Sequence, residues 1–213
     1  MIQTIDGLLP DTDYEIMLVR ANEASETVTF HTEPEPITLN VRDFGAFGDG
    51  VHDDTSAIQA AILCCPKNAR VLIPKGTYPV TALFLKSDMI LELQENAVLA
   101  GIYDRARTPI LPGQIEYDNE DGYYNLGSWE GNPIDSFASM ITGIHVKNVT
   151  ICGKGVLDGR ADFENWWSRP KDKIRAWRPR MIFLNHCENI TVVGVTVQNS
   201  PAWNLHPYFS NQI

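Results

Sequence analysis

The sequence lacks the features that place a protein in or across a membrane. None of its apolar runs is long enough to span a bilayer. The N-terminus has neither the basic start nor the apolar stretch of an export signal. As written, the chain is predicted to be cytoplasmic, without a membrane partner, unless its start is missing.

Cysteine and basic residues are scarce as well. Of the four cysteines, Cys64 and Cys65 are adjacent, while Cys152 and Cys187 fall within strand-like repeats. We therefore interpret all four as small buried hydrophobic residues rather than as a disulfide framework. With 17 basic against 27 acidic residues, the formal net charge is −10, which argues against nucleic acid as a partner of the whole surface.

A pattern of about twenty residues, in contrast, occurs twice. Met140–Gly159 and Met181–Ser200 align at an offset of 41 and share seven residues: Met140/Met181, Ile141/Ile182, His145/His186, Asn148/Asn189, Thr150/Thr191, Gly153/Gly194 and Val156/Val197. The runs Asn-Val-Thr-Ile and Asn-Ile-Thr-Val alternate in polarity and contain β-branched residues, which favours strands. The two glycines mark corners. A third unit is predicted to open at Gln212-Ile213, 23 positions after Asn189-Ile190.

Repeats of this size predict an all-β solenoid in which each coil stacks on the next. Two unrelated hairpins with chance similarity are the alternative. Domain boundaries follow from composition: residues 1–35 form one part and residues 36–213 the solenoid.

Residues 1–36 carry eight carboxylates against Arg20 alone. Within them, Tyr14 leads into an alternating run and residues 27–32 give a second strand. This part resembles the last strands of a fibronectin type III domain, in which the tyrosine hydroxyl bonds to the chain just upstream. Two or three strands cannot bury a sandwich core, so we expect a partial β-sandwich in a chain truncated at its start.

A glycine-rich turn at residues 43–50 precedes a short amphipathic helix, for which Ser56 and Gln59 have the spacing of a capping box. We interpret Asp53 and Asp54 as helix-capping residues rather than as a catalytic pair. Strand-like runs then follow over Arg70–Gly101. This order resembles the opening of the pectin-lyase-like right-handed parallel β-helices, which is specific for the fold and weak for function.

Two segments interrupt the repeats. The stretch 102–136 has little periodicity, and it is either a functional elaboration or a wrap over one side of the coils. Arg160–Arg180 carries seven basic and three acidic residues and three of the five tryptophans. Indole rings stack on sugar faces and guanidinium groups bind carboxylates, so this segment suits an anionic polysaccharide. A solvated basic loop pinned by core tryptophans is the alternative.

The run Asn199-Ser200-Pro201-Ala202-Trp203-Asn204-Leu205-His206 resembles the Asn-Ser-Pro-x-Trp-x-x-His motif of glycoside hydrolase family 28, the polygalacturonases. Gly153, Gly155, Asp158 and Gly159 fit the same family's Gly-x-Gly-x-x-Asp-Gly turn, although we expect Asp158 to close a turn. The resemblance, of the bacterial exo-acting type, implies metal-free, cofactor-free, inverting hydrolysis of α-1,4-linked galacturonate in pectin. The substrate-binding residues that we predict are Trp166, Trp167, Trp177, Arg178, Arg180, Trp203 and His206.

The family's catalytic signatures Asn-Thr-Asp, Gly-His-Gly and Arg-Ile-Lys are absent from the sequence. No residue is therefore assigned a catalytic role, and the chain alone is expected to be an inactive fragment. Alternatives are a non-catalytic module that binds acidic polysaccharide, a tailspike-like module, and a calcium-dependent lyase on the same fold. We also expect self-association through an exposed C-terminal coil.

Overall fold

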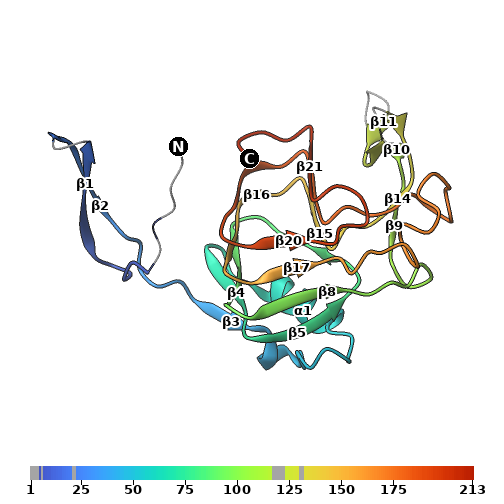
Figure 1. Cartoon of the computed structure of the whole chain (residues 1–213), viewed down its shortest axis with the longest axis horizontal. Helices are drawn as coiled ribbons and strands as arrows, with labels where there is room; N and C mark the ends of the chain where they lie inside the picture. Colours follow the sequence, from blue (N-terminus) through green and yellow to red (C-terminus); the bar gives the residue numbers. More distant parts are fainter. Residues whose placement is uncertain (1–4, 6, 21–22, 117–122, 130–131) are drawn as a thin grey trace. The chain divides into compact units, whose positions relative to one another are not determined.

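Stacked parallel strands build the larger part of the protein in the computed structural model (Figure 1). The structure describes residues 5, 7–20, 23–116, 123–129 and 132–213. These fall into two units, Met1–Ile37 and Thr38–Ile213. Each unit is described by itself.

The first unit is an antiparallel pair of strands, β1 (Asp13–Arg20) and β2 (Glu23–His31). Tyr14 lies opposite Phe30, and their rings stack with centroids 5.8 Å apart. The Tyr14 hydroxyl accepts a hydrogen bond of 2.7 Å from the backbone N–H of Leu9. The bond predicted from this tyrosine to the chain just upstream is therefore present.

The second unit is a right-handed parallel β-helix made of three parallel sheets, as the repeats predict. The chain passes through the sheets in turn, so each circuit adds one strand to each. The first sheet contains β6 (Leu83–Phe84), β15 (Ile141–Ile144), β18 (Ile182–Asn185) and β21 (Leu205–Tyr208). The second contains β3 (Thr38–Asn40), β4 (Ala69–Ile73), β7 (Met89–Leu93), β16 (Lys147–Gly153) and β19 (Glu188–Val192). The third contains β5 (Gly76–Val80), β8 (Ala97–Gly101), β17 (Val156–Asp158) and β20 (Thr196–Gln198).

The predicted offset of 41 holds in two of the three sheets. Ile141 pairs with Ile182 in the first sheet, and Val149 pairs with Ile190 in the second. In the third sheet, however, Val156 pairs with Thr196, so the predicted match of Val156 with Val197 is wrong by one residue. The corner after Gly194 is one residue shorter than the corner after Gly153, which shifts the next strand.

The third unit predicted near the C-terminus is present, because Glu188 bridges Asn211 at the expected offset of 23. The backbone N–H of Ile190 donates to the carbonyl of Gln212 over 2.9 Å. The same offset relates Ile182 to Leu205 in the first sheet.

Apolar side chains that point inward form columns along the solenoid. Leu91 lies between Val71 and Ile151 in the second sheet, and all three are fully buried. Similar columns occur in the other sheets, because alternate residues of every strand face the same side. Burial of these columns is the main contribution to the stability of the unit.

The corner between the first and second sheets is made by residues with left-handed backbone conformation. Asn68, Asp88, Asn148, Asn189 and Gln212 have φ between 53° and 59°. Asn68 and Asp88 immediately precede β4 and β7, and Asn148 and Asn189 are the second residues of β16 and β19. Asn148 donates to the Asp88 carboxylate over 2.7 Å, and Asn189 donates to the Asn148 side-chain oxygen over 2.9 Å. Asparagine and aspartate tolerate this conformation best among residues with a side chain, which explains why they recur here.

A helix covers the end of the solenoid where the second unit begins, after the 3-10 turn η1 (Val41–Phe44). Helix α1 spans Thr55–Cys64, and Asp54 precedes it. The predicted capping box is wrong, because the Gln59 side chain bonds the backbone of Phe84 instead. The buried Asp54 carboxylate accepts the backbone N–H groups of Phe47 and Gly48, so it ties the glycine-rich turn to the helix. No helix in the described parts of the chain is long and apolar enough to cross a membrane.

Two excursions leave the solenoid at the corner between the third and first sheets, on the same side of the unit (Figure 1). Residues 102–139 form the first excursion and residues 160–180 form the second. The first contains short antiparallel pairs: β9 (Ile110–Leu111) with β14 (Ser136–Phe137), β10 (Gln114–Glu116) with β11 (Tyr123–Asn125), and β12 (Ser128–Trp129) with β13 (Asn132–Pro133). Residues 117–122 and 130–131 of the predicted loop lie outside the described part.

Candidate functional site

The two excursions are joined through the backbone of Trp177. Its N–H donates to the carbonyl of Asp135 and its carbonyl accepts the N–H of Phe137, each over 2.9 Å. The Asp135 carboxylate in turn accepts bonds of 3.0 Å from the Gly113 N–H and from the Lys173 ammonium group. These two bonds lower the pKa of Asp135, so it is ionised at neutral pH. The excursions thus form one connected wall beside the first sheet.

Three tryptophans from three separate segments stack in this wall. Trp129 of the first excursion lies between Trp177 of the second and Trp203, which precedes β21. The ring centroids are 5.6 Å and 5.3 Å apart, with interplanar angles of 20° and 9°. Trp203 is the most exposed of the three, at 42%. The indole at the end of the stack is therefore partly accessible to solvent, as contact with a sugar ring requires.

Arg180 contacts two rings of this stack and is almost completely buried, with 1% of its surface exposed. Its guanidinium carbon lies 5.4 Å from the Trp129 centroid and 5.6 Å from the Trp203 centroid. One terminal nitrogen donates to the carbonyl of Ser128, while Nε is buried without a hydrogen-bond partner. Burial lowers the pKa of Arg180 to about 10, so the side chain remains charged at neutral pH.

Arg178 is the second buried guanidinium group, and it lies 4.0 Å from the Trp167 ring centroid and 5.8 Å from that of Trp129. It donates to the carbonyl of Pro201 over 2.5 Å, and its Nε also has no partner. Burial and the nearby Arg105 lower its pKa. Trp167 is fixed by a bond of 3.0 Å from its indole N–H to the carbonyl of Ser200.

His206 lies on β21, where its ring contacts Trp203 edge-on at 4.6 Å and Phe183 at 5.3 Å. Its Nδ1 is buried without a hydrogen-bond partner. Burial and the positive charge of Arg180 lower the pKa of His206 to about 4. The imidazole is therefore neutral at pH 5 and above, and it offers an unused nitrogen beside a buried cation.

We define the aromatic-arginine cluster as these seven residues: Trp129, Trp167, Trp177, Arg178, Arg180, Trp203 and His206. It includes six of the seven predicted substrate-binding residues. The seventh, Trp166, is 3% exposed and packs against Phe137 and Ala176 in a separate apolar group, with the Arg105 guanidinium 4.5 Å from its ring. Sugar binding by the six residues stays a prediction.

Trp129 is the member that the sequence did not single out. It lies in a segment without periodicity, and its partners are 48 and 74 positions away in the sequence. The signal that was available is its residue type within a long excursion, since aromatic residues there had no apparent strand or helix to stabilise.

Asp158 lies at the corner where the second excursion departs, and its bonds are those of a turn. Although burial acts in the opposite direction, bonds from Asn199, from the Arg160 N–H and from Gln198 lower its pKa. A carboxylate held in the ionised form is a poor general acid. This agrees with the prediction that Asp158 closes a turn.

The guanidinium and indole groups of the cluster can bind an anionic sugar, but the cluster contains no pair of carboxyl groups that could act as general acid and general base. Among the described residues, no carboxylate is ion-paired with Arg178 or Arg180. Burial of two guanidinium groups without a carboxylate partner among the described residues carries a desolvation cost, which the carbonyl and aromatic contacts offset in part. An acidic ligand that stacks on Trp203 would supply the missing charge and the hydrogen bonds.

Two family models match the chain. "Rhamnogalacturonase A/epimerase, pectate lyase-like" matches residues 38–156, and "Glycosyl hydrolases family 28" matches residues 106–212. Among curated proteins, the exo-poly-alpha-D-galacturonosidase of Dickeya chrysanthemi is 36% identical over 93% of this chain and 32% of its own length. A probable polygalacturonase of Vitis vinifera is 30% identical over 80% of this chain and 34% of its own length.

Solved structures give the same result. The family 28 exopolygalacturonase of Yersinia enterocolitica superposes with a TM-score of 0.69 at 29% identity, covering 92% of this chain and 42% of that one. An exopolygalacturonase from Thermotoga maritima gives 0.66 at 26% identity, over 83% of this chain and 46% of that one. The chain spans about a third of the length of the curated relatives it matches.

Proposed function

The chain belongs to glycosyl hydrolases family 28, and we propose that it forms the part of a polygalacturonase that holds acidic sugar beside the site of cleavage. The reaction is hydrolysis of α-1,4-linked galacturonan, the acidic polymer of pectin. The named relatives that act as exopolygalacturonases support action at chain ends.

The burial of Arg180 is the observation that carries this proposal. A guanidinium group at 1% exposure, without a carboxylate partner among the described residues and with an unsatisfied Nε, would be stabilised further by a ligand that brings a negative charge. A uronic acid has a carboxylate for Arg180 and an apolar ring face for Trp203. His206 contributes an uncharged donor or acceptor beside them.

The chain by itself is proposed to bind galacturonan without cutting it. Inverting hydrolysis needs two carboxyl groups about 6.5–9.5 Å apart, one protonated and one ionised. The signatures that carry such groups in this family are absent from the sequence, and the ionised Asp158 is already engaged by three donors. Binding and cleavage are thus assigned to different parts of the whole protein.

The test measures binding and hydrolysis on the same preparation. We expect trigalacturonate to bind in isothermal titration calorimetry and neutral galactotriose to bind at least tenfold more weakly, because a hydrogen-bonded charge contributes about 1.5–3 kcal/mol. Reducing ends released from polygalacturonate should stay at the level of the buffer. Turnover that is retained in Trp203→Ala and lost in Asp158→Ala would show that Asp158 is a catalytic acid, contrary to this proposal.

A second candidate function is that of a module that binds acidic polysaccharide and belongs to no hydrolytic protein. The absence of a carboxylate from the aromatic-arginine cluster, as far as the structure describes it, favours this possibility. The two differ in the longer protein: the same binding with turnover identifies the hydrolase, and binding without turnover identifies the module.

For the first unit we propose a partial fibronectin type III module. The Tyr14 to Leu9 bond and the stacked pair of Tyr14 and Phe30 support it. If the tyrosine hydroxyl fixes this corner, Tyr14→Phe should lower the protection of the β1 and β2 backbone amides against hydrogen exchange.

A further inference from the structure

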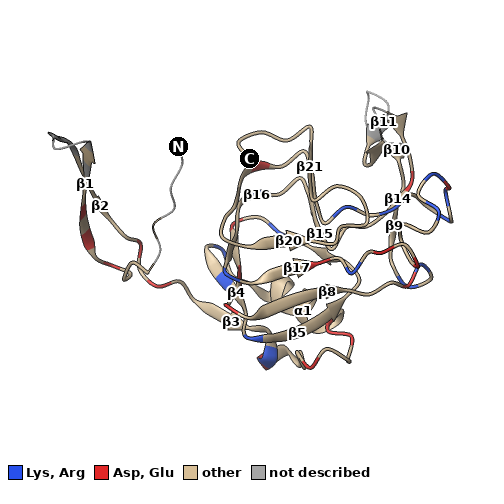
Figure 2. Cartoon of the chain, viewed as in Figure 1, with Lys and Arg blue, Asp and Glu red and all other residues tan. Residues whose placement is uncertain are grey.

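Positive charge is concentrated in the second excursion, while the rest of the chain is acidic. Residues 160–180 carry a formal charge of +4 within a chain of −10, so the remainder carries −14. Figure 2 shows basic segments on the excursions at the right of the view. A long polyanion is therefore repelled by most of the protein and attracted by this segment.

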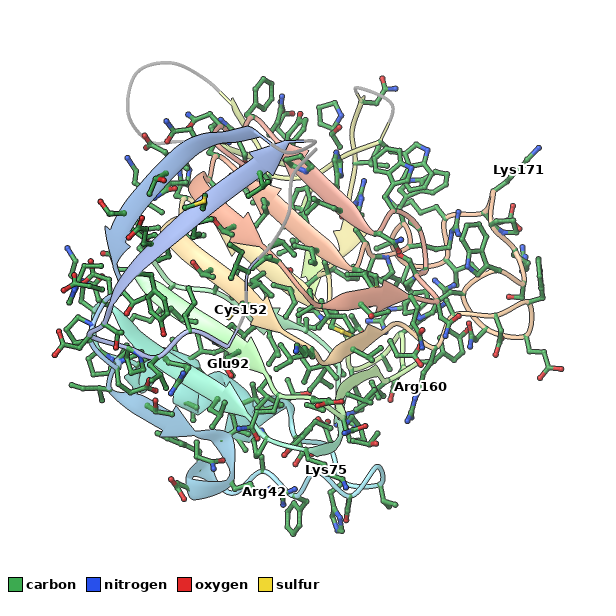
Figure 3. The ribbon with its side chains drawn as sticks, turned by 60° about the vertical axis from the view of Figure 1, so that its left-hand side comes forward. Arg42, Lys75, Glu92, Cys152, Arg160 and Lys171 are labelled. Atoms are coloured by element: carbon green, nitrogen blue, oxygen red, sulfur yellow. The ribbon has the colours of Figure 1, made fainter. Side chains whose placement is uncertain are left out.

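The tip of the excursion, residues 169–175, holds most of this exposed charge. Its four basic side chains are exposed, and they are Arg169, Lys171, Lys173 and Arg175. Asp172 is the only acidic residue within the tip, and it pairs with Arg169. Lys171 points away from the body of the unit in Figure 3, and no ion pair of this lysine is found within the described residues. Lys171 is thus a cation with no ion pair among the described residues, and it stands beside three further exposed basic side chains.

The base of the tip is held in place by contacts with the first excursion. Lys173 forms an ion pair of 3.0 Å with Asp135, and Arg175 donates to the carbonyl of Arg105 over 2.5 Å. Ile174 bridges Ala176, and Trp177 is bound on both sides by residues 135–137. The exposed cations are therefore presented at a defined position rather than on a free loop.

The tip is also contiguous with the aromatic-arginine cluster. Arg175 and Trp177 are two residues apart, so their Cα atoms lie within about 7 Å of each other. A polymer whose terminal sugar occupies the cluster has its further carboxylates close to the tip. Charge complementarity and this continuity identify the polymer itself as the occupant, rather than a separate partner protein.

We propose that residues 169–175 are a landing surface for the distal part of a polyuronate chain, which makes the protein bind long chains more tightly than short ones. This inference rests on the proposed function. The attraction is between solvated charges, so it acts over about one Debye length and is screened by salt. Its main effect is on the rate of association.

The test compares Arg169→Gln/Lys171→Gln with the matched control Lys67→Gln/Lys75→Gln, which removes two exposed positive charges on the solenoid body. Neither pair includes the residues that anchor the tip. Affinities for polygalacturonate and for trigalacturonate are measured by calorimetry at low and high salt. We expect the tip variant to lose roughly fivefold in affinity for the polymer at low salt, in line with two surface charge pairs. It should keep wild-type affinity for the trimer and match wild type at high salt.

The outcomes separate the two claims. Wild-type protein that binds neither ligand overturns the proposed function and this inference with it. Wild-type binding of both ligands, with equal loss in the tip variant and the control, overturns the landing surface alone. Single-stranded oligo-dT that binds as tightly as polygalacturonate, and loses affinity in the same variant, would assign the tip to nucleic acid and refute the polyuronate.

Discussion

Arg180 is predicted to favour ligand binding at the expense of the fold, and Arg180→Met separates the two effects. Burial lowers its pKa to about 10, which corresponds to about 3 kcal/mol against the charged form. The bond to Ser128 and the contacts with three aromatic rings offset this cost by a similar amount, since each cation-π contact contributes about 0.5–2 kcal/mol. Methionine has a similar length and needs no hydrogen bonds.

We therefore expect Arg180→Met to change the free energy of unfolding by less than about 1 kcal/mol, or to increase it, as replacements of buried charges often do. The affinity for trigalacturonate should fall by roughly 10- to 100-fold, because a charged hydrogen bond contributes about 1.5–3 kcal/mol. Urea unfolding and calorimetry measure the two quantities. The reasoning is refuted if the variant loses more than 2 kcal/mol of stability while its affinity is unchanged.

Three further predictions concern the corner, the histidine and the joint between the excursions. Gly153→Ala should lower the free energy of unfolding, measured in urea, by roughly 3 kcal/mol or more, because its φ is +107° and a Cβ would lie 2.0 Å from the Leu93 carbonyl oxygen. In the control Gly127→Ala, the added Cβ would lie 3.1 Å from the Ile134 carbonyl oxygen, so the loss of stability should be smaller. Because the pKa of His206 is lower in the folded protein, the unfolded chain binds a proton at a higher pH than the folded chain does. The free energy of unfolding should therefore fall by up to about 2 kcal/mol from pH 6.5 to 4, and His206→Gln should remove this pH dependence. Asp135→Ala should weaken the circular dichroism couplet of the stacked indoles, whereas Asp135→Asn, which keeps an acceptor for Gly113, should retain it.

The solenoid could be predicted because each coil repeats the same short-range chemistry. The asparagine at the corner, the alternating strand and the glycine recur at positions that the structure places in register. The one-residue shift that pairs Thr196 with Val156 could not be predicted from the sequence. Val156 and Val197 stand at the expected offset and suggested a column of valines, although the corner after Gly194 is one residue shorter than the corner after Gly153. Local matching of residue types cannot detect a change in corner length.

The site was only partly predictable, for a different reason. The motif around Trp203 and His206 and the charge of the second excursion are local signals, and they identified most of the cluster. The position of Trp129 depends on how two excursions fold against each other, which no pattern of spacing encodes. The same holds for Trp166, whose burial against Phe137 follows from that docking rather than from its neighbours in the sequence.

The column of left-handed residues between the first and second sheets has a consequence for how the protein can vary. Successive members of this column are separated by 20, 60, 41 and 23 residues, yet they stand in register. The extra residues of the longer coils lie in the two excursions, which both leave at the corner between the third and first sheets. Each coil can therefore accept an insertion of any length at this one corner. Grafting a different excursion there should change which ligand is recognised while the spacing between coils stays the same.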